Sequence, residues 1–347
     1  MLKDKLHNMM LSAPVNVTWE ITRRCNANCR HCLSSARMAQ CPEDMDTAAC
    51  RAFIDQLVAA DVFQVNIGGG EPFLREDIWD IFAYCHQYQL VTCTSTNGSL
   101  LDMEAARRLS LGPYHFLQVS LDGASSEVND AIRGEGAFAG AVKGIENLRT
   151  AGFKNLSLNT VVTAVNFQHL PELYRLAQYY GAKPRLSRFR PSGGGAKMWE
   201  SYHLSQEQTL ELAEILSAHP DIVTGDSFFS ITKEDRQHLG LNMCGAAKMT
   251  CAVSPDGNFY PCAFLQEPQF LCGNVLQESF MEIWKFSKVL SMLRSLDAHA
   301  CADCRRFNIC HGGCPAIAWH ICRDISAPDP ACIEAAALKI GKLTVGA

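Results

Sequence analysis

Three cysteines near the start of the chain have the spacing of ligands for a metal or an iron–sulfur cluster. Cys25, Cys29 and Cys32 follow a C-x3-C-x2-C pattern within ITRRCNANCRHCLSSA, residues 21–36. Four thiolates would complete a tetrahedral zinc site or a cubane cluster, so three leave one position open. On spacing alone, a fragment of a zinc site and a cluster with one free iron are about equally compatible with this motif.

The last third of the chain carries a denser group of cysteines. Of 17 cysteines, none lies between Cys93 and Cys244, and ten lie within residues 244–332. Clustered cysteines in a reducing compartment are more typical of metal binding than of disulfides. Cys244 is followed by twelve residues, Gly257, four residues and Cys262. Further along the chain, 2, 5 and 3 residues separate Cys301, Cys304, Cys310 and Cys314, and Cys332 comes last. Two zinc ribbons are one interpretation, because tight cysteine pairs suit zinc.

The other cysteines are less informative. We expect Cys41, Cys50, Cys85 and Cys93, which fall in helical or strand patterns, to be small buried side chains. Cys272 and Cys322 lie among the possible ligands, and their role stays open.

Glycines and polar residues follow the predicted strands at two other places. GGGEP, residues 68–72, would let the polar end of a ligand approach the backbone, and Glu71 can pair with an ammonium group. Ser120 and Asp122 end a later strand, and Arg133 follows in VNDAIRG. Each feature also has an ordinary explanation, as a glycine turn, a strand-end cap or a surface charge.

The elements that must position these residues are short strands that alternate with amphipathic stretches. Strands are predicted at 15–21, 63–68, 90–96, 116–122, 156–163 and 184–190, and helices near 46–60, 75–88, 102–110, 137–151 and 168–180. The alternation predicts α/β architecture with βαβ units and a parallel sheet. Six units fit a partial (β/α)6 barrel, open on one side, with its ligand site at the carboxyl ends of the strands. The three-cysteine loop directly follows the first strand, so we expect it on that rim.

The remainder of the chain predicts a smaller, loop-rich region. PSGGGAK, residues 191–197, is typical of a flexible boundary, and a helix is predicted near 204–218. From about residue 240 onward, we expect a poor folding unit unless metal supplies its core. We therefore divide the chain into an N-terminal extension at 1–14, the partial barrel at 15–200, a linker or bridging helix at 201–239, a cysteine-rich domain at 240–335 and a tail at 336–347.

Charge and hydropathy argue against several classes of partner. The 347 residues carry a net charge of -5 and no long basic stretch, so a nucleic-acid partner is not expected. No apolar run approaches the roughly 18 residues that span a membrane. His7, Asn8 and Pro14 interrupt any signal-like segment at the N-terminus. We expect a cytoplasmic protein with no membrane partner.

Together, the cysteine loop after the first strand, GGGEP after the second and the order of the six units resemble the radical S-adenosylmethionine (SAM) superfamily. In that family three cysteines hold three irons of a 4Fe–4S cluster and SAM chelates the fourth, which accounts for the open position. The resemblance implies that Cys25, Cys29 and Cys32 hold this cluster. It also implies contacts to SAM from His31 near adenine, from Gly69, Gly70 and Glu71 at the ammonium group, from Ser120 and Arg133 at the carboxylate and from Ser95 at the ribose.

The C-terminal spacing resembles the SPASM domain, which carries two auxiliary 4Fe–4S clusters in peptide-modifying members of the superfamily. Adding Cys251 gives eight ligands. The family's interleaved connectivity implies one cluster on Cys244, Cys251, Cys262 and Cys314, and another on Cys301, Cys304, Cys310 and Cys332. The cofactors implied for the whole chain are thus SAM and three 4Fe–4S clusters.

Motifs along residues 13–335 narrow the resemblance to the mycofactocin radical SAM maturases. The matching stretches are APVNVTWEIT, HCLSSA, VNIGGGEP, RPSGGG, TGDSFF, LNMCGA, FLCGN and DPAC. Ala263 stands where sulfatase-maturing relatives have a proton-accepting Asp, which counts against that activity. We expect TGDSFF, residues 224–229, to line the substrate side, with Asp226 as a polar contact or an ordinary loop cap.

The resemblance implies a radical SAM oxidoreductase that cleaves SAM to a 5′-deoxyadenosyl radical and oxidatively modifies a ribosomally made peptide. For mycofactocin maturases, this means decarboxylation of a C-terminal tyrosine and then a carbon–carbon bond to the preceding valine. Implied partners are the precursor peptide, a reductant of flavodoxin or ferredoxin type and a separate peptide-binding delivery protein. Only about fourteen residues precede the first strand, too few for a recognition domain of ordinary size.

Four alternatives stay open at this stage. Within the SPASM enzymes they are crosslinking of the pyrroloquinoline-quinone type and thioether formation. From other classes they are a non-enzymatic iron–sulfur electron carrier and a zinc-stabilised binding module, although neither accounts for a three-cysteine loop beside GGGEP.

Overall fold

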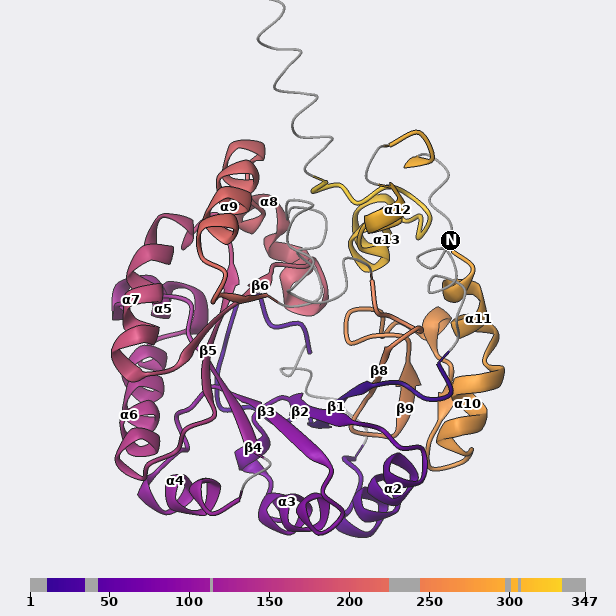
Figure 1. Ribbon diagram of the computed structural model, residues 1–347, viewed down its shortest axis with the longest axis horizontal. Coiled ribbons are helices and arrows are strands. Elements are labelled where there is room, and N and C mark those ends of the chain that lie inside the picture. The colour runs from indigo at the N-terminus through magenta and orange to yellow at the C-terminus, as the bar shows by residue number, and fades with distance from the viewer. Residues whose placement is uncertain are drawn as a thin grey trace, which may run out of the picture.

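A curved, mostly parallel sheet forms a partial barrel, and helices cover its outer face (Figure 1). This computed structural model describes residues 11–34, 43–112, 115–224, 244–296, 301–304 and 307–332. The six barrel strands β1 to β6 span Asn16–Thr22, Gln64–Gly69, Val91–Thr96, His115–Ser120, Leu156–Val162 and Lys183–Arg188. Neighbouring strands pair in parallel from β1 to β6, so the predicted α/β barrel strands are confirmed.

Helices connect the strands, and most of them bury an apolar stripe against the sheet. They are α2 Thr47–Ala59, α3 Ile78–Gln87, α4 Met103–Ser110, α5 Ser126–Arg133, α6 Ala137–Thr150 and α7 Leu170–Tyr180, with short 3₁₀ helices η1 Pro72–Leu74 and η2 Phe167–His169. The Asp46 and Asp102 side chains accept hydrogen bonds from first-turn N–H groups, which fixes where α2 and α4 begin. Across the described ranges, no helix combines the length and the apolar character that crossing a membrane requires.

Helix α5 was not among the predicted helices. It has only eight residues, and two of the three side chains that it buries, Asn129 and Arg133, are polar. A short segment with a polar buried face lacks the apolar periodicity from which helices are predicted. Its burial of Arg133 brings that side chain to the rim of the barrel.

The segment after β6 packs against the cysteine loop. Residues Gly193–Met198 form the 3₁₀ helix η3, and the Gly194 N–H donates to the Cys32 carbonyl at 2.9 Å. Ser192 and Gly195 are buried there, so the prediction of a flexible boundary at 191–197 is wrong. The glycines serve close packing, because a Cβ on Gly195 would lie 2.7 Å from the His31 carbonyl oxygen. Helices α8 Trp199–Tyr202 and α9 Gln206–Ala218 and strand β7 Val223–Thr224 follow, and α9 confirms the helix predicted near 204–218.

The cysteine-rich region extends the barrel sheet beyond β1. Strand β8, Thr250–Val253, pairs in parallel with β1, and β9 Asn258–Tyr260 and β10 Gly273–Asn274 continue antiparallel. The strand order is β10-β9-β8-β1-β2-β3-β4-β5-β6-β7. The edge of the barrel at β1 is therefore covered by a strand from far along the chain. The remaining elements are η4 Pro268–Phe270, α10 Phe280–Phe286, α11 Lys288–Arg294, α12 Phe307–Cys310 and α13 Pro315–Cys322.

Aromatic side chains join the cysteine-rich region to the barrel core. Phe280 of α10 contacts Phe53 of α2 with ring centroids 6.0 Å apart, and Phe53 in turn contacts Trp19 of β1 at 5.1 Å. Phe259 of β9 lies 5.4 Å from Phe280 on the other side. Residues 244–296 thus share an apolar core with the barrel, and the expectation that metal must supply their core is wrong for this part.

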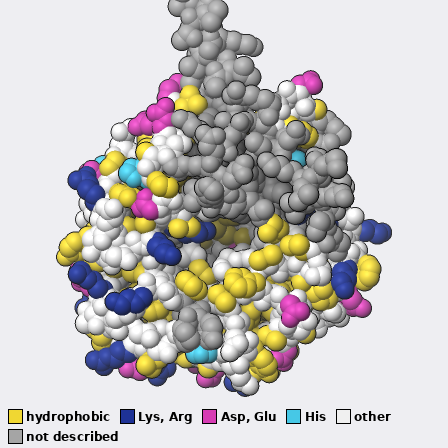
Figure 2. Space-filling view, viewed as in Figure 1, with side chains coloured by type: hydrophobic (Ala, Val, Ile, Leu, Met, Phe, Trp, Pro, Cys, Tyr) yellow, Lys and Arg dark blue, Asp and Glu magenta, His cyan; other side chains and the backbone are white. Residues whose placement is uncertain are grey.

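Viewed as in Figure 1, the molecule has a hollow near the centre of the face (Figure 2). Apolar side chains border this hollow, whereas Lys and Arg side chains lie mostly towards the periphery. An apolar border favours the entry of a partly apolar ligand and helps to exclude water from the space behind it.

The shared aromatic core generates a prediction about stability. We expect Phe280→Ala to lower the free energy of unfolding of the whole chain by about 3–5 kcal/mol, because a fully buried ring at a contact between two regions is lost. Urea unfolding followed by tryptophan fluorescence measures the change. Phe286→Ala, in the same helix but with a ring that is 78% exposed, is the matched control and should change stability by less than about 0.5 kcal/mol. Equal effects of the two substitutions would contradict the shared core.

Candidate functional site

The three N-terminal cysteines lie together where β1 ends, on the carboxyl rim of the sheet. All three residues are half-buried. Burial raises the pKa of the Cys25 thiol, and neighbouring Glu71, Cys29 and Cys32 raise it further. Three thiols that act on one another in this way would repel as thiolates, and the positive charge of bound irons removes that repulsion. The donor set therefore fits a cluster with three protein ligands.

The loop after β2 crosses directly under the cysteine loop. The Gly70 N–H donates to the Thr22 carbonyl at 2.7 Å, and the Glu71 N–H donates to the Arg24 carbonyl at 2.8 Å. A Cβ on Gly70 would lie 2.0 Å from the Arg24 carbonyl oxygen, and Gly69 has a φ of +106°. Only glycine fits such a close approach of two backbones. The glycines of GGGEP thus fix the position of this loop relative to the cysteines.

The Glu71 carboxylate has partners inside the protein. It accepts hydrogen bonds from the Thr96 hydroxyl at 2.7 Å, the Asn97 N–H at 2.8 Å and the Phe73 N–H at 3.3 Å. The residue is only 1% exposed, and burial raises its pKa to about 7 in spite of these bonds. Glu71 therefore joins the β2 loop to the end of β3, a structural role that sequence reasoning missed. Ser95, also at the end of β3, is half-buried on the same rim.

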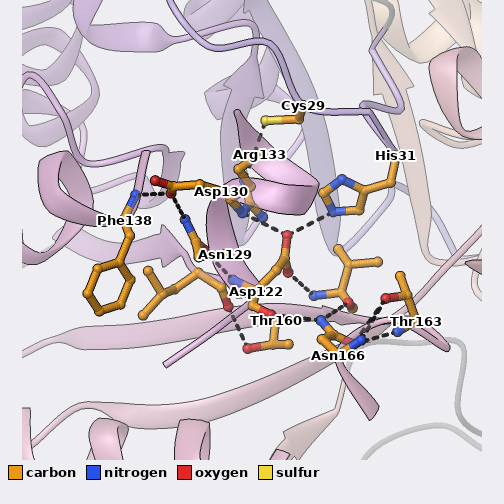
Figure 3. A network of polar contacts seen from close by, with 12 residues as sticks. Cys29, His31, Asp122, Asn129, Asp130, Arg133, Phe138, Thr160, Thr163 and Asn166 are labelled. Carbon is orange, nitrogen blue, oxygen red and sulfur yellow. Dashed lines mark hydrogen bonds and ion pairs between the residues drawn. The ribbon is translucent and has the colours of Figure 1, made fainter. Parts of the chain in front are cut away.

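A buried carboxylate, that of Asp122, holds the side chains of His31 and Arg133 beside the cysteines (Figure 3). Its Oδ2 lies 3.0 Å from His31 Nε2 and 2.7 Å from Arg133 Nε, and its Oδ1 accepts from the Val161 N–H at 2.8 Å. Arg133 also places Nη1 3.8 Å from Cys29 Sγ. Burial by itself would raise the pKa of Asp122, but Arg133 and His31 outweigh it and lower the value to about 2. Asp122 is therefore ionised, and it positions residues from the cysteine loop and from α5.

Asn166 supports this network from below, and sequence reasoning did not single it out. Its Nδ2 donates to the carbonyls of Asp122 and Val161, both at 3.0 Å, and its Oδ1 accepts from the Thr163 N–H at 2.8 Å. Ser120, the last residue of β4, is half-buried on the same rim and pairs in register with Asn159. The only signal of Asn166 in the sequence is an asparagine after a strand, which is also common in ordinary turns.

Four C-terminal cysteines come together beside an ion pair to the barrel. Burial raises the pKa of the Cys301 thiol, and nearby Cys310, Cys332 and Cys304 raise it further, so these four lie close to one another. Asp329, three residues before Cys332, forms a bidentate ion pair with Arg188 of β6, with both N–O distances at 2.6 Å. The Asp329 carboxylate also accepts from the Cys314 N–H at 3.0 Å. The ion pair thereby fixes the four-cysteine group, which has as many thiols as a 4Fe–4S cluster has irons, against the barrel.

Three further cysteines, Cys244, Cys262 and Cys314, line one pocket. Thr18 of β1, Thr250 of β8 and Arg190 line the same pocket. Cys251 does not line it, although the family's connectivity implied that it would. Across the residues described here, no three His, Cys, Asp or Glu side chains lie close enough together to bind a single metal ion. Ligands of a cluster bind different irons, so they need not converge on one point.

The remaining sequence predictions have separate outcomes. Cys50, Cys85 and Cys93 are buried, as predicted, Cys272 is half-buried and Cys322 is exposed. The Cys272 thiol lies 3.4 Å from the Phe270 carbonyl. Cys41 and Asp226 lie outside the described residues, as does most of TGDSFF.

Comparison with known families matches both parts of the chain. The model of the radical SAM superfamily matches residues 19–177, and that of SPASM, an iron–sulfur cluster-binding domain, matches residues 244–306. Mycofactocin maturase MftC of Mycolicibacterium smegmatis is 42% identical over 329 residues, covering 93% of this chain and 84% of the relative. The AdoMet-dependent heme synthase of Nitratidesulfovibrio vulgaris is 28% identical, and that match covers 91% of each chain.

Solved structures share the architecture. SuiB of Streptococcus suis, crystallised with its precursor peptide SuiA, superimposes with a TM-score of 0.75 over 95% of this chain and 78% of SuiB, at 19% identity. The enzyme anSMEcpe with bound AdoMet superimposes with a TM-score of 0.71 over 93% of this chain and 95% of anSMEcpe, also at 19% identity. At such identities the likeness establishes the fold.

The buried ion pair of Asp122 generates a second prediction. We expect Asp122→Ala to lower the free energy of unfolding by about 3–5 kcal/mol, because it leaves Arg133 buried without its counter-charge. Urea unfolding measures the loss. The double variant Asp122→Leu/Arg133→Met should be more stable than Asp122→Ala alone, since it removes both charges together. A double variant that is no more stable than Asp122→Ala would contradict a coupled pair.

Proposed function

The chain belongs to the mycofactocin maturase family of radical SAM enzymes, and on this premise we propose that it acts on a ribosomally made precursor peptide that ends in Val-Tyr. The enzyme would first remove the carboxylate of the C-terminal tyrosine oxidatively and then join this residue to the valine by a carbon–carbon bond. The observation that carries the proposal is the similarity to MftC over nearly the whole chain. The predicted superfamily and the barrel followed by a SPASM domain are confirmed, so the chain is an enzyme with iron–sulfur chemistry.

We assign the N-terminal rim to SAM. Cys25, Cys29 and Cys32 would hold three irons of the cluster, and the fourth would be left for SAM. When SAM and an electron are supplied, this site provides a 5′-deoxyadenosyl radical. The protein's own contribution is position: the short contacts between the GGGEP backbone and the cysteine loop keep the two loops at a fixed distance.

The remaining SAM contacts are assigned by their place on this rim. Gly69, Gly70 and Glu71 would face the ammonium group, and an ammonium near Glu71 would favour its ionised form. Arg133, held by Asp122, would bind the carboxylate together with Ser120. His31 would lie near adenine and Ser95 near the ribose. All of these residues come from β1, β2, β3, β4 and the segments that follow those strands.

The auxiliary sites would take the surplus electron of the oxidation. When the tyrosine loses one hydrogen atom and then CO2, a proton and one electron also leave the substrate. We propose two auxiliary 4Fe–4S clusters, one on Cys301, Cys304, Cys310 and Cys332, and one in the pocket of Cys244, Cys262 and Cys314. The Arg188–Asp329 ion pair and the pairing of β8 with β1 hold this region against the barrel, which keeps the distance for electron transfer short.

Two further partners belong to this proposal. A separate peptide-binding protein would deliver the precursor, and a reductant of flavodoxin or ferredoxin type would supply the electron for SAM cleavage. The apolar border of the hollow in Figure 2 suits a peptide whose last two side chains are valine and tyrosine.

The substrate assignment has a direct test. With SAM, a reductant and the delivery protein, we expect a Val-Tyr peptide to give a first product that is lighter by the elements of formic acid, since CO2 and two hydrogens are lost. Mass spectrometry measures it, and deuterium at the tyrosine Cβ should appear in 5′-deoxyadenosine. The matched control is the same peptide with a C-terminal carboxamide, which cannot lose CO2. An intact C-terminal carboxylate alongside a crosslink or thioether elsewhere would overturn the assignment.

A further inference from the structure

The alternation of β8 directs Cys251 away from the pocket of Cys244, Cys262 and Cys314. Successive side chains of a strand point to opposite faces of the sheet. Thr250 lines the pocket, so Cys251 faces the other way. The partner strand agrees: Thr18 of β1 also lines the pocket, whereas Val17, which pairs with Cys251, is fully buried in the apolar core.

The Cys251 side chain lies on the outer face of the sheet, under α11. Cys272 and Arg294 are the ionisable groups that act on its thiol. Arg294, the last residue of α11, donates to the Ala247 carbonyl at 2.8 Å and to the Trp284 carbonyl at 2.7 Å. Figure 1 shows α10 and α11 outside β8 and β9. For Cys251 to face the pocket, β8 would have to shift by one residue relative to β1. Such a shift would move every side chain of β8 to the opposite face of the sheet.

We propose that the cluster in this pocket is held by only three cysteines, Cys244, Cys262 and Cys314, and that its fourth iron is open to a carboxylate from outside the chain. This inference rests on the iron–sulfur assignment made under the proposed function and departs from it in the ligand set. It gives the protein two clusters with an open iron, one on the cysteine loop and one in the C-terminal pocket.

The other side chains of the pocket favour an anionic ligand. Arg190, which is 7% exposed, lines the pocket with its guanidinium 3.8 Å from the centre of the Phe264 ring. A stacked guanidinium is a rigid partner for a carboxylate. Thr18 adds a hydroxyl group that can donate to the same oxygen atoms. The C-terminal carboxylate of a peptide matches this chemistry.

The ligand set is tested by single substitutions in a chain that lacks the N-terminal site. In the background Cys25→Ala/Cys29→Ala/Cys32→Ala, we expect Cys251→Ser to keep the iron and sulfide content and the EPR spectrum of the reduced protein. Cys262→Ser, the matched change at a pocket cysteine, should lower the iron content or alter the spectrum. The same pair of substitutions in the otherwise unchanged chain guards against poor folding of the triple background.

Two results would overturn the three-cysteine ligand set. One is a loss of iron in Cys251→Ser equal to that in Cys262→Ser, which would make Cys251 a ligand. The other is full retention of iron and spectrum in Cys262→Ser, which would remove Cys262 from the site. Neither readout uses the peptide, so failure here and failure of the decarboxylation assay are distinguishable.

The open iron is tested with a small anion. In the triple background, 13C-labelled cyanide should give a 13C hyperfine coupling to the reduced cluster in ENDOR spectra, and excess acetate should diminish it by competing for the same iron. Cys262→Ser should abolish the coupling. Absence of any 13C coupling in a chain shown to hold both auxiliary clusters would overturn the open position, and a coupling that acetate leaves unchanged would overturn the carboxylate as its ligand.

Discussion

The buried carboxylate of Asp122 is the contact on which the arrangement of the rim depends. Its contact with His31 and its ion pair with Arg133 connect the cysteine loop, the end of β4 and α5, and its bond to the Val161 N–H adds β5. A buried charge is tolerated only when it is paired, so these side chains have little freedom to move independently. The thiols next to them, and the SAM that they would bind, inherit this fixed geometry.

The same constraint operates at the junction with the cysteine-rich region. Arg188 and Asp329 form a buried bidentate ion pair, and β8 extends the barrel sheet beside β1. Auxiliary clusters on this region would therefore stay at constant distance from the barrel interior. That rigidity suits an oxidation in which the substrate radical must lose an electron before water or oxygen reaches it.

Local patterns predicted the barrel but not its contacts. Alternating apolar runs identified β1 to β6, and spacing identified the cysteine loop, because both depend on residues close in sequence. The pairing of β8 with β1 and the packing of η3 on the cysteine loop depend on partners far along the chain. Cys251 shows the limit most clearly: its distance in sequence from Cys244 suits a ligand, but the face of β8 on which it lies cannot be read from spacing.

The central claim is that Cys25, Cys29 and Cys32 form the site that cleaves SAM. The most direct measurement is the yield of 5′-deoxyadenosine, with iron content, for the triple variant to Ala under reducing conditions. Cys85→Ala, at a buried cysteine of α3, is the matched control. The account predicts no 5′-deoxyadenosine from the triple variant, which should keep about eight irons in its auxiliary sites, and normal yield from the control. Continued production of 5′-deoxyadenosine by the triple variant would contradict it.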